Sequence, residues 1–209
     1  MSAEQRHQHA LERRLTADEF KRAVYIDFEG FTEQPPTLAG ILIDGQFEQV
    51  VFDQGLSAAA RHSKLQALDA KEWARGLLER VSREQRRVVA FSSHEKTVFQ
   101  VFFDINLKPF YADARMIAKS LRKSLNYPPG CPPRDLKSYL LAIGFERGIH
   151  LGERKSTARI RAVSDMLAKR GDFDQLTPVV KAKWTKLLDH NRIDVLGMHA
   201  LVREALKLD

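Results

Sequence analysis

The stretch AVYIDFEG, at residues 23–30, decides the fold because it predicts a buried strand that carries charge. β-Branched and aromatic residues followed by a glycine are typical of a strand. Side chains alternate between the two faces of a strand, so Asp27 and Glu29 project from one face while apolar neighbours occupy the other. Two buried carboxylates need a compensating charge, which a divalent cation or a pair of arginines would supply. A structural or solvent-exposed role for the two acids stays open.

Two more strands are expected directly after this one. A Pro-Pro pair at residues 35–36 interrupts the chain, and the apolar residues 38–43 then predict a second strand. An Asp-Gly hairpin signal at residues 44–45 precedes residues 47–52, which predict the returning third strand. These three strands form an antiparallel meander in which we expect the first strand to be central.

The hydrophobic period then changes from that of strands to that of helices. Two short apolar runs, residues 88–91 and 110–113, predict buried strands, the first of them parallel. Ser92 and Ser93 are candidate caps for a helix between these runs. The helix after these caps is predicted to run through Val98, Val101 and Phe102. Other helices are predicted where apolar residues recur at helical spacing, over residues 65–81, 116–125, 136–143, 157–167 and 179–206.

Together these segments predict one α/β domain over residues 23–209, preceded by a polar helical lead-in at residues 1–22. Within the lead-in, Thr16 and Glu19 have the spacing of a capping box. The expected fold is a ribonuclease H-like mixed sheet of three antiparallel N-terminal strands and two parallel strands. Helices are expected on both faces of this sheet and throughout the C-terminal half. A proline-rich loop at residues 127–133 interrupts that half.

The composition is that of a folded protein of 209 residues, with 44% hydrophobic and 29% charged residues. No apolar run approaches the roughly 20 residues that a membrane-spanning helix needs. The polar N-terminus lacks the apolar region of a secretory signal. The single cysteine, Cys131, excludes an internal disulfide framework and cysteine-rich zinc modules. We therefore expect a soluble cytoplasmic protein without a membrane partner.

The charge of the chain favours a polyanionic partner. The formal net charge is +7, and residues 115–186 alone hold 16 basic and 6 acidic residues. This excess favours nucleic acid over acidic small molecules. A solvated helical surface would have the same composition, so that alternative stays open.

Three further polar residues accompany the two acids of the first strand. His190 and Asp194 are four residues apart on a predicted helix, so they share one face. Glu95 lies in the first turn of the helix after the fourth strand. Taken alone, the pair indicates a surface hydrogen bond, and the glutamate indicates a favourable interaction with the helix dipole. Combined with Asp27 and Glu29, they form an ordered set that indicates catalytic chemistry.

In order and spacing, this set resembles the motifs of the ribonuclease H-like DEDD, or DnaQ-like, superfamily of 3′–5′ exonucleases. The most similar branch is that of predicted nucleases found beside or fused to RecB-type nucleases and helicases. The resembling segments are YIDFEG (residues 25–30), FSSHEKTVF (91–99), RDLKSYL (134–140) with IGF (143–145), and HNRIDV (190–195). The resemblance extends from residue 23 to residue 206.

Two positions depart from the pattern of this superfamily. The second motif carries Glu95 where most members have an aspartate, and Asp104 and Asp113 are the alternative acids. The third motif carries His190 at the spacing of the tyrosine-type branch, one residue closer to Asp194 than in the histidine-type branch.

The resemblance implies a metal-dependent exonuclease that hydrolyses single-stranded DNA or RNA ends by a two-metal mechanism. Clustered carboxylates and all-oxygen ligation favour two Mg²⁺ or Mn²⁺ ions. The implied metal ligands are Asp27, Glu29, Glu95 and Asp194, and His190 is implied to orient or deprotonate the attacking water. The implied substrate contacts are Gly30, Phe31, Lys137, Arg154 and Lys155, and other basic residues expected along the phosphate backbone are Arg134, Arg159 and Arg161. A core role for Phe31 is an equal alternative.

Two other functions stay open at this point. The first is a catalytically weak or inactive module that binds nucleic acid or a protein partner such as a helicase or nuclease. The departures at Glu95 and His190 are the reason to keep it. The second is a structure-specific endonuclease on the same fold, which end-blocked substrates would distinguish from an exonuclease.

Overall fold

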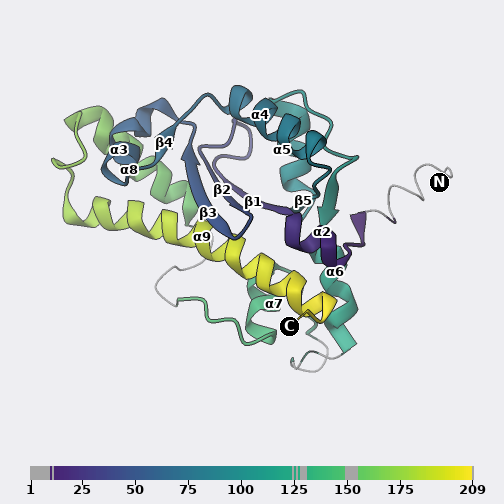
Figure 1. The fold of residues 1–209 in the computed structure, drawn as a ribbon. Helices are drawn as coiled ribbons and strands as arrows, with labels where there is room; N and C mark the ends of the chain where they lie inside the picture. Colours follow the sequence, from purple (N-terminus) through teal and green to yellow (C-terminus); the bar gives the residue numbers. More distant parts are fainter. Residues whose placement is uncertain are drawn as a thin grey trace.

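The computed structural model describes residues 10, 12–123, 125, 127, 131–148 and 155–208. In this part of the chain a mixed sheet has the strand order β4-β3-β2-β1-β5-β6 (Figure 1). The architecture is α/β and consistent with a ribonuclease H-like fold. The strands are β1 (Val24–Glu29), β2 (Leu38–Ile43), β3 (Gln46–Val51), β4 (Gln66–Ala67), β5 (Val88–Ala90) and β6 (Tyr111–Asp113).

The helices account for most of the remaining described residues. In the first half they are α2 (Ala17–Arg22), α3 (Ser57–His62), α4 (Ala70–Arg83), α5 (His94–Phe102) and α6 (Ala114–Ala118), with the 3₁₀ turns η1 (Gln54–Leu56) and η2 (Lys119–Lys123). The C-terminal half contributes α7 (Leu136–Ala142), α8 (Ser156–Arg170) and α9 (Pro178–Leu206).

The pairing of β1 confirms that the first strand is central. It is antiparallel to β2, with Asp27 opposite Gly40, and parallel to β5, with Tyr25 opposite Val89. The hairpin between β2 and β3 turns at Asp44 and Gly45, which both have positive φ angles, as the sequence signal requires. The carboxyl ends of β1, β5 and β6 therefore lie at one edge of the sheet, because these three strands are parallel.

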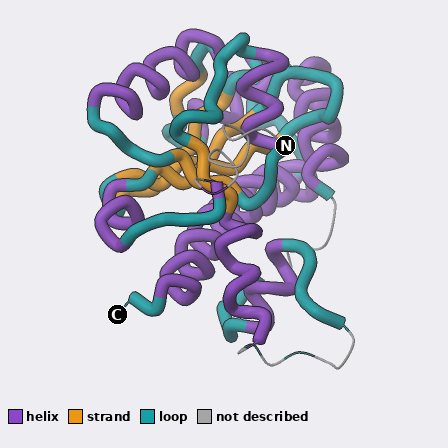
Figure 2. The backbone as a smooth tube through the Cα atoms, turned by 90° about the vertical axis from the view of Figure 1, so that its right-hand side faces the viewer, coloured by secondary structure: helices purple, strands orange, loops and turns teal. Residues whose placement is uncertain are grey.

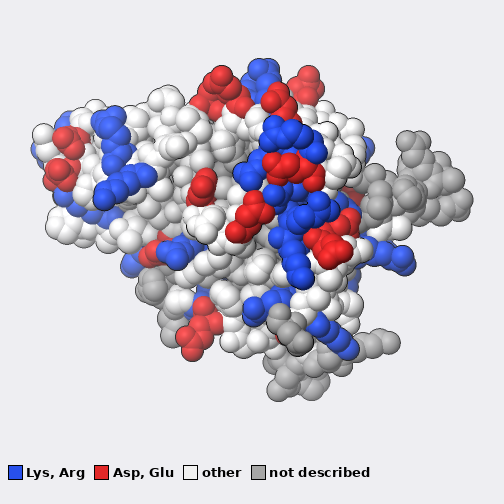
Figure 3. All heavy atoms as spheres, in the orientation of Figure 1, with Lys and Arg blue, Asp and Glu red and all other residues white. Residues whose placement is uncertain are grey.

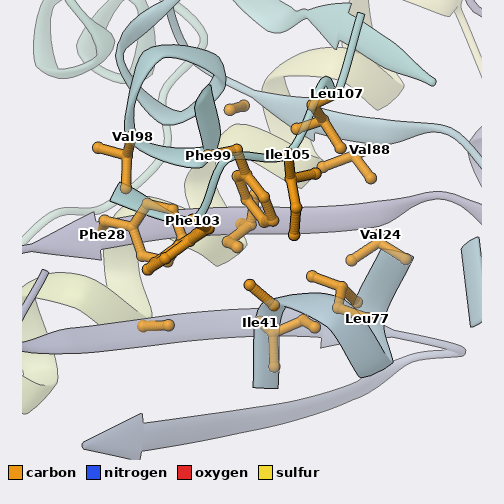
Figure 4. Close-up of a cluster of buried hydrophobic side chains, with 14 of the residues drawn as sticks. Val24, Phe28, Ile41, Leu77, Val88, Val98, Phe99, Phe103, Ile105 and Leu107 are labelled. Atoms are coloured by element: carbon orange, nitrogen blue, oxygen red, sulfur yellow. The ribbon is translucent and has the colours of Figure 1, made fainter. Parts of the chain in front are cut away.

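Helices cover both faces of the sheet, as Figures 1 and 2 show. On one face, Val24 and Phe28 of β1 share a core with Leu77 of α4 and Phe99 of α5 (Figure 4). On the other face, Tyr25 packs with α9, which crosses the sheet and also contacts α6, α7 and α8. The alternation along β1 thus directs Val24, Ile26 and Phe28 into one layer. It leaves Tyr25 and the two carboxylates on the face toward α9.

The structure differs from the sequence prediction around residues 65–81. Leu65 and Leu68 lie outside any helix and flank β4, a short strand that pairs with β3. Their spacing of three residues fits a helix, but Asp69 caps the N-terminus of α4 by accepting a hydrogen bond from the Glu72 backbone N–H at 2.9 Å. The helix therefore begins at Ala70. The preceding helix α3 had no predicted counterpart.

The lead-in and the C-terminal helices follow the prediction more closely. Thr16 and Glu19 form the expected capping box at the start of α2. The helix expected from residue 116 begins at Ala114 and tightens into a 3₁₀ turn after Ala118. Within the described ranges, no helix combines the length and the apolar character needed to cross a membrane.

Candidate active site

His190 lies between Glu29 of β1 and Asp194 of α9. Its Nε2 atom lies 3.7 Å from Oε1 of Glu29 and 3.5 Å from Oδ2 of Asp194. Both carboxylates are largely buried, because β1 is the central strand and the middle of α9 lies directly against it. Three residues that the sequence predicted to share a site are therefore in one place.

Asn191 fixes the fourth member, Asp27. Its side-chain N–H₂ donates to the Asp27 backbone oxygen at 3.0 Å and to Oδ2 of Asp27 at 2.9 Å. Its side-chain oxygen accepts a hydrogen bond from Nε2 of Gln49 at 2.9 Å. Gly40 makes this contact sterically feasible, since any Cβ at that position would collide with the Asn191 amide. The fully buried Asn191 thus sets the distance between β1 and α9.

Glu95 approaches the same edge of the sheet from α5. It lies in the first turn of this helix, is only 5% exposed, and its Oε2 atom has no hydrogen-bond partner. Burial, with the nearby Asp113 and Glu29 carboxylates, raises the pKa of Glu95 to about 8. Asp113 caps α6 at the end of β6, whereas Asp104 is exposed beyond the opposite end of α5. Of the two alternative acids, only Asp113 lies near the cluster.

The pKa values of the four acids are all raised, and burial is the largest cause in each case. Burial raises the pKa of Asp27 well above its ordinary value, and the Glu29, Asp194 and Glu95 carboxylates raise it further. Burial also raises the pKa of Glu29 to about 8 and raises the pKa of Asp194. Neighbouring carboxylates add to the effect of burial for Asp27, Glu29 and Glu95. His190 and Arg147 partly offset the effect of burial on the pKa of Asp194.

Arg147 is a site residue that the sequence analysis missed. Its Nη2 and Nε atoms donate to Oδ1 of Asp194 at 3.0 and 3.2 Å. The same Nη2 lies 3.0 Å from Nδ1 of His190, which must accept because a guanidinium only donates. Burial lowers the pKa of His190, which favours the neutral ring. Nothing in the spacing of Arg147 signals this position, since it depends on the path of the loop after α7.

The position of Arg159 differs from the expectation that this residue lies along a nucleic-acid backbone. It is 6% exposed, its Nη1 donates to the Lys186 backbone oxygen at 3.4 Å, and its charge lowers the pKa of Glu29. Because the side chain of Arg159 is buried beside the acids, its positive charge stabilises the ionised form of Glu29 inside the protein. Arg161 lies over the ring of Phe31, with 5.7 Å from its Cζ atom to the ring centroid.

A cavity of about 220 Å³ opens beside the acids. It is lined by Phe28, Glu29, Gly30, Phe31, Thr32, Gln34, Pro36, His94, Val98, Phe102, Ser156 and Thr157. At Gly30 a Cβ would lie 3.1 Å from the Pro36 Cα, and the Thr157 hydroxyl donates to the Gly30 carbonyl at 3.3 Å. Phe31 is half-buried and packs against the core that α8 shares, which confirms its core role, and it also lines the cavity, where a substrate contact stays a prediction.

The remaining predicted substrate contacts are exposed or lie outside the described residues. Lys137 is exposed in the first turn of α7, where its charge lowers the pKa of Asp135. Lys155 is exposed at the start of α8. Arg154 lies outside the residues that the structure describes.

The chemistry of the acidic cluster fits hard divalent cations, although the side chains are not in ligating positions. Carboxylate oxygens are the ligands that Mg²⁺ and Mn²⁺ prefer, and the unpartnered Oε2 of Glu95 is a buried donor atom of this kind. Among the described residues, no group of three or more His, Cys, Asp or Glu side chains is already arranged to hold a metal. Asn191 occupies one oxygen of Asp27, and Arg147 occupies one oxygen of Asp194.

These features were compared with known proteins at three levels. The comparisons of the chain with protein-family models, with curated proteins and with solved structures each gave no match.

Proposed function

We propose that this protein is a metal-dependent 3′–5′ exonuclease that hydrolyses the ends of single-stranded DNA or RNA. The observation that carries the proposal is the convergence of Asp27, Glu29, Glu95 and Asp194 from three separate elements at the carboxyl end of the central strand. Buried carboxylates are costly unless cations balance them. Fold stability gives no reason to gather four of them, whereas a phosphodiester-cleaving site does.

The roles of the residues follow from their places. Asp27, Glu29, Glu95 and Asp194 would hold Mg²⁺ or Mn²⁺. When bound, these ions generate hydroxide from water near neutral pH and neutralise the charge of the reacting phosphate. His190 lies between Glu29 and Asp194, so its neutral ring is placed to orient the attacking water. It could accept the proton of that water only after Arg147 leaves Nδ1, because the ring proton can then move from Nε2 to Nδ1. The cavity beside Glu29 provides space and an aromatic wall for the terminal nucleotide.

An assay with end-labelled oligonucleotides tests this proposal. We expect stepwise shortening of single-stranded DNA or RNA from the 3′ end with Mn²⁺, and no shortening with a chelator. Asp27→Asn and Asp194→Asn should remove the activity, whereas Asp104→Asn, an exposed acid outside the cluster, should preserve it. Cleavage of 3′-blocked substrates would indicate an endonuclease, and unchanged cleavage in chelator would reject the metal-dependent mechanism.

A second candidate function is a module that binds nucleic acid without cutting it. The observation that favours it is the ion pair between Arg147 and Asp194, in which a guanidinium takes the place of a metal charge. Titration calorimetry separates the two candidates. Uptake of Mn²⁺ by the wild-type protein, lost in Asp27→Asn, supports the nuclease, whereas oligonucleotide binding without Mn²⁺ uptake supports the module.

A further inference from the structure

Among the described residues, two arginines, Arg147 and Arg159, face the four carboxyl groups of the acidic cluster, and they differ in their setting. Arg159 is anchored within α8 and its side chain reaches the Lys186 backbone oxygen. Arg147 lies outside any helix or strand, on the chain that leads from α7 toward α8. Its side chain is 15% exposed, and its described hydrogen bonds go to two side chains of α9. Arg147 is therefore the cation that can leave the cluster with the least disruption of the fold.

The guanidinium of Arg147 and a divalent cation compete for the same oxygens. Oδ1 of Asp194 receives both Nε and Nη2 of Arg147, at 3.2 and 3.0 Å. A cation that used Asp194 would lie within a few ångströms of this guanidinium, where like charges repel strongly in a poorly solvated site. Arg147 also holds Nδ1 of His190 as an acceptor, which leaves the proton of the neutral ring on the Nε2 that faces Glu29 and Asp194.

We propose that Arg147 is a displaceable counter-ion of the acidic cluster that becomes a phosphate-binding residue. When a divalent cation binds, the guanidinium leaves Asp194 and His190 and binds a phosphate oxygen of the nucleic-acid chain beside the cavity. The planar fork of a guanidinium suits this exchange, because it pairs with phosphate in the same bidentate way as with carboxylate. The inference rests on the proposed nuclease function, since that function brings cation and phosphate to the site.

The exchange predicts that removal of the Arg147 charge changes the affinity for Mn²⁺ and the affinity for nucleic acid in opposite directions. Arg147→Gln eliminates the competitor of the cation, so the affinity for Mn²⁺ should rise by about tenfold, within the range typical of coupled sites. It also eliminates a phosphate contact, so the affinity for a single-stranded oligonucleotide should fall. One lost contact should lower the salt dependence of that affinity by about 0.7 in the slope of log K against log salt.

Two binding measurements with a matched control test this. Mn²⁺ is titrated calorimetrically into the wild-type protein, Arg147→Gln, Arg147→Lys and Arg75→Gln. Arg75 is exposed on α4, on the opposite face of the sheet, so Arg75→Gln makes the same charge change away from the site. A fluorescein-labelled single-stranded DNA is then titrated by anisotropy in Ca²⁺, with its integrity checked on a gel. We expect the two opposite shifts in Arg147→Gln, smaller shifts in Arg147→Lys, and none in Arg75→Gln.

Other outcomes overturn the inference in distinguishable ways. If wild-type protein takes up Mn²⁺ and cuts, but Arg147→Gln binds Mn²⁺ with equal or lower affinity, the exchange is wrong and the nuclease proposal stands. If Mn²⁺ affinity rises while DNA affinity and its salt slope stay unchanged, Arg147 is a counter-ion that does not bind phosphate. If neither the wild-type protein nor Arg147→Gln takes up Mn²⁺, both proposals fail. Circular dichroism of each variant shows that its fold is retained.

Discussion

The two ends of the central strand carry charged clusters of opposite design. At the amino end, Arg86 donates to Asp44 at 2.7 Å and to Glu84 at 2.5 Å, and Arg80 donates to Asp44 at 3.1 Å. Positive and negative groups alternate there, as they do over much of the face shown in Figure 3. At the carboxyl end, four acids meet beside Arg147 and Arg159, the arginines that face them among the described residues. The acids are Asp27, Glu29, Glu95 and Asp194.

The difference appears in the direction of the pKa shifts. The Arg86 guanidinium, with Arg83 and Arg80, lowers the pKa of Glu84. Burial raises the pKa of Glu29 to about 8. The first cluster satisfies its charges within the chain and stabilises the hairpin and the start of the strand. The second holds buried carboxyl groups whose ionisation is opposed by burial, a perturbation that is common at functional sites and that supports the proposed binding of cations.

Matched Glu→Gln substitutions at the two ends of the central strand should differ most in their effects on activity and Tm. Glu29→Gln removes a proposed metal ligand, so we expect nuclease activity to fall by roughly 10²–10³ or more, the size of effect typical of removing a group that stabilises a transition state. The same change removes a buried negative charge from metal-free protein, so its Tm above about pH 8 should rise. Glu84→Gln should preserve the activity and lower the Tm. Activity assays and thermal unfolding in chelator measure both effects.

Equal activity losses in these two variants, or a lower metal-free Tm for Glu29→Gln above pH 8, would contradict this contrast between the clusters. Either result would mean that the acids at the carboxyl end are satisfied within the fold, as those at the amino end are.

The pH dependence of stability should distinguish the clusters next. The folded protein holds protons on Glu29 and Glu95 up to about pH 8, whereas the unfolded chain loses them near pH 4.5. Between these values the native state binds more protons, so the free energy of unfolding in chelator should fall as pH rises, by on the order of a few kcal/mol. Glu84, whose pKa is lowered, contributes stability that is lost only as pH falls below its ordinary range. Urea unfolding at several pH values measures this.

Two controls sharpen the pH prediction. Glu95→Gln should flatten the decline, since one of the carboxyl groups with a raised pKa is gone. Mn²⁺ should oppose the decline, because a cation stabilises the deprotonated carboxylates of the native state. A free energy of unfolding that stays constant between about pH 5 and pH 8 in chelator would contradict the raised pKa values.

The sequence predicted the acids of the site better than their counter-charges. Alternation along residues 24–29 places Asp27 and Glu29 on one face whatever surrounds the strand, and helical spacing does the same for His190 and Asp194. These side-chain directions depend only on the local backbone geometry, so the rest of the fold does not change them. Arg147 follows no such rule, because the loop after α7 brings it to Asp194 and no periodicity relates the two.

The same reasoning explains the correct and the wrong predictions for the fold. The second strand was predicted with its observed bounds, Leu38–Ile43, because an apolar run between a Pro-Pro pair and an Asp-Gly turn permits little else. The prediction that the helix begins at Leu65 was wrong. Two leucines three residues apart fit one face of a helix, and they fit the two faces of a short edge strand equally well. Pairing with β3, a tertiary contact, decided between them.

The smallest expected effect tests the charge balance of the amino-terminal cluster. Arg86 is 11% exposed at its side chain and also donates to the Arg22 backbone oxygen at 2.8 Å, so it connects the end of α2, the hairpin and the chain before β5. Arg86→Gln should lower the free energy of unfolding by about 1 kcal/mol, since partly exposed ion pairs contribute little and the backbone hydrogen bond adds to them. High salt should reduce the difference between variant and wild type, because salt screens the ion pairs. Mn²⁺ affinity should stay unchanged, and a change in it would show that the two clusters are coupled along the strand that separates them.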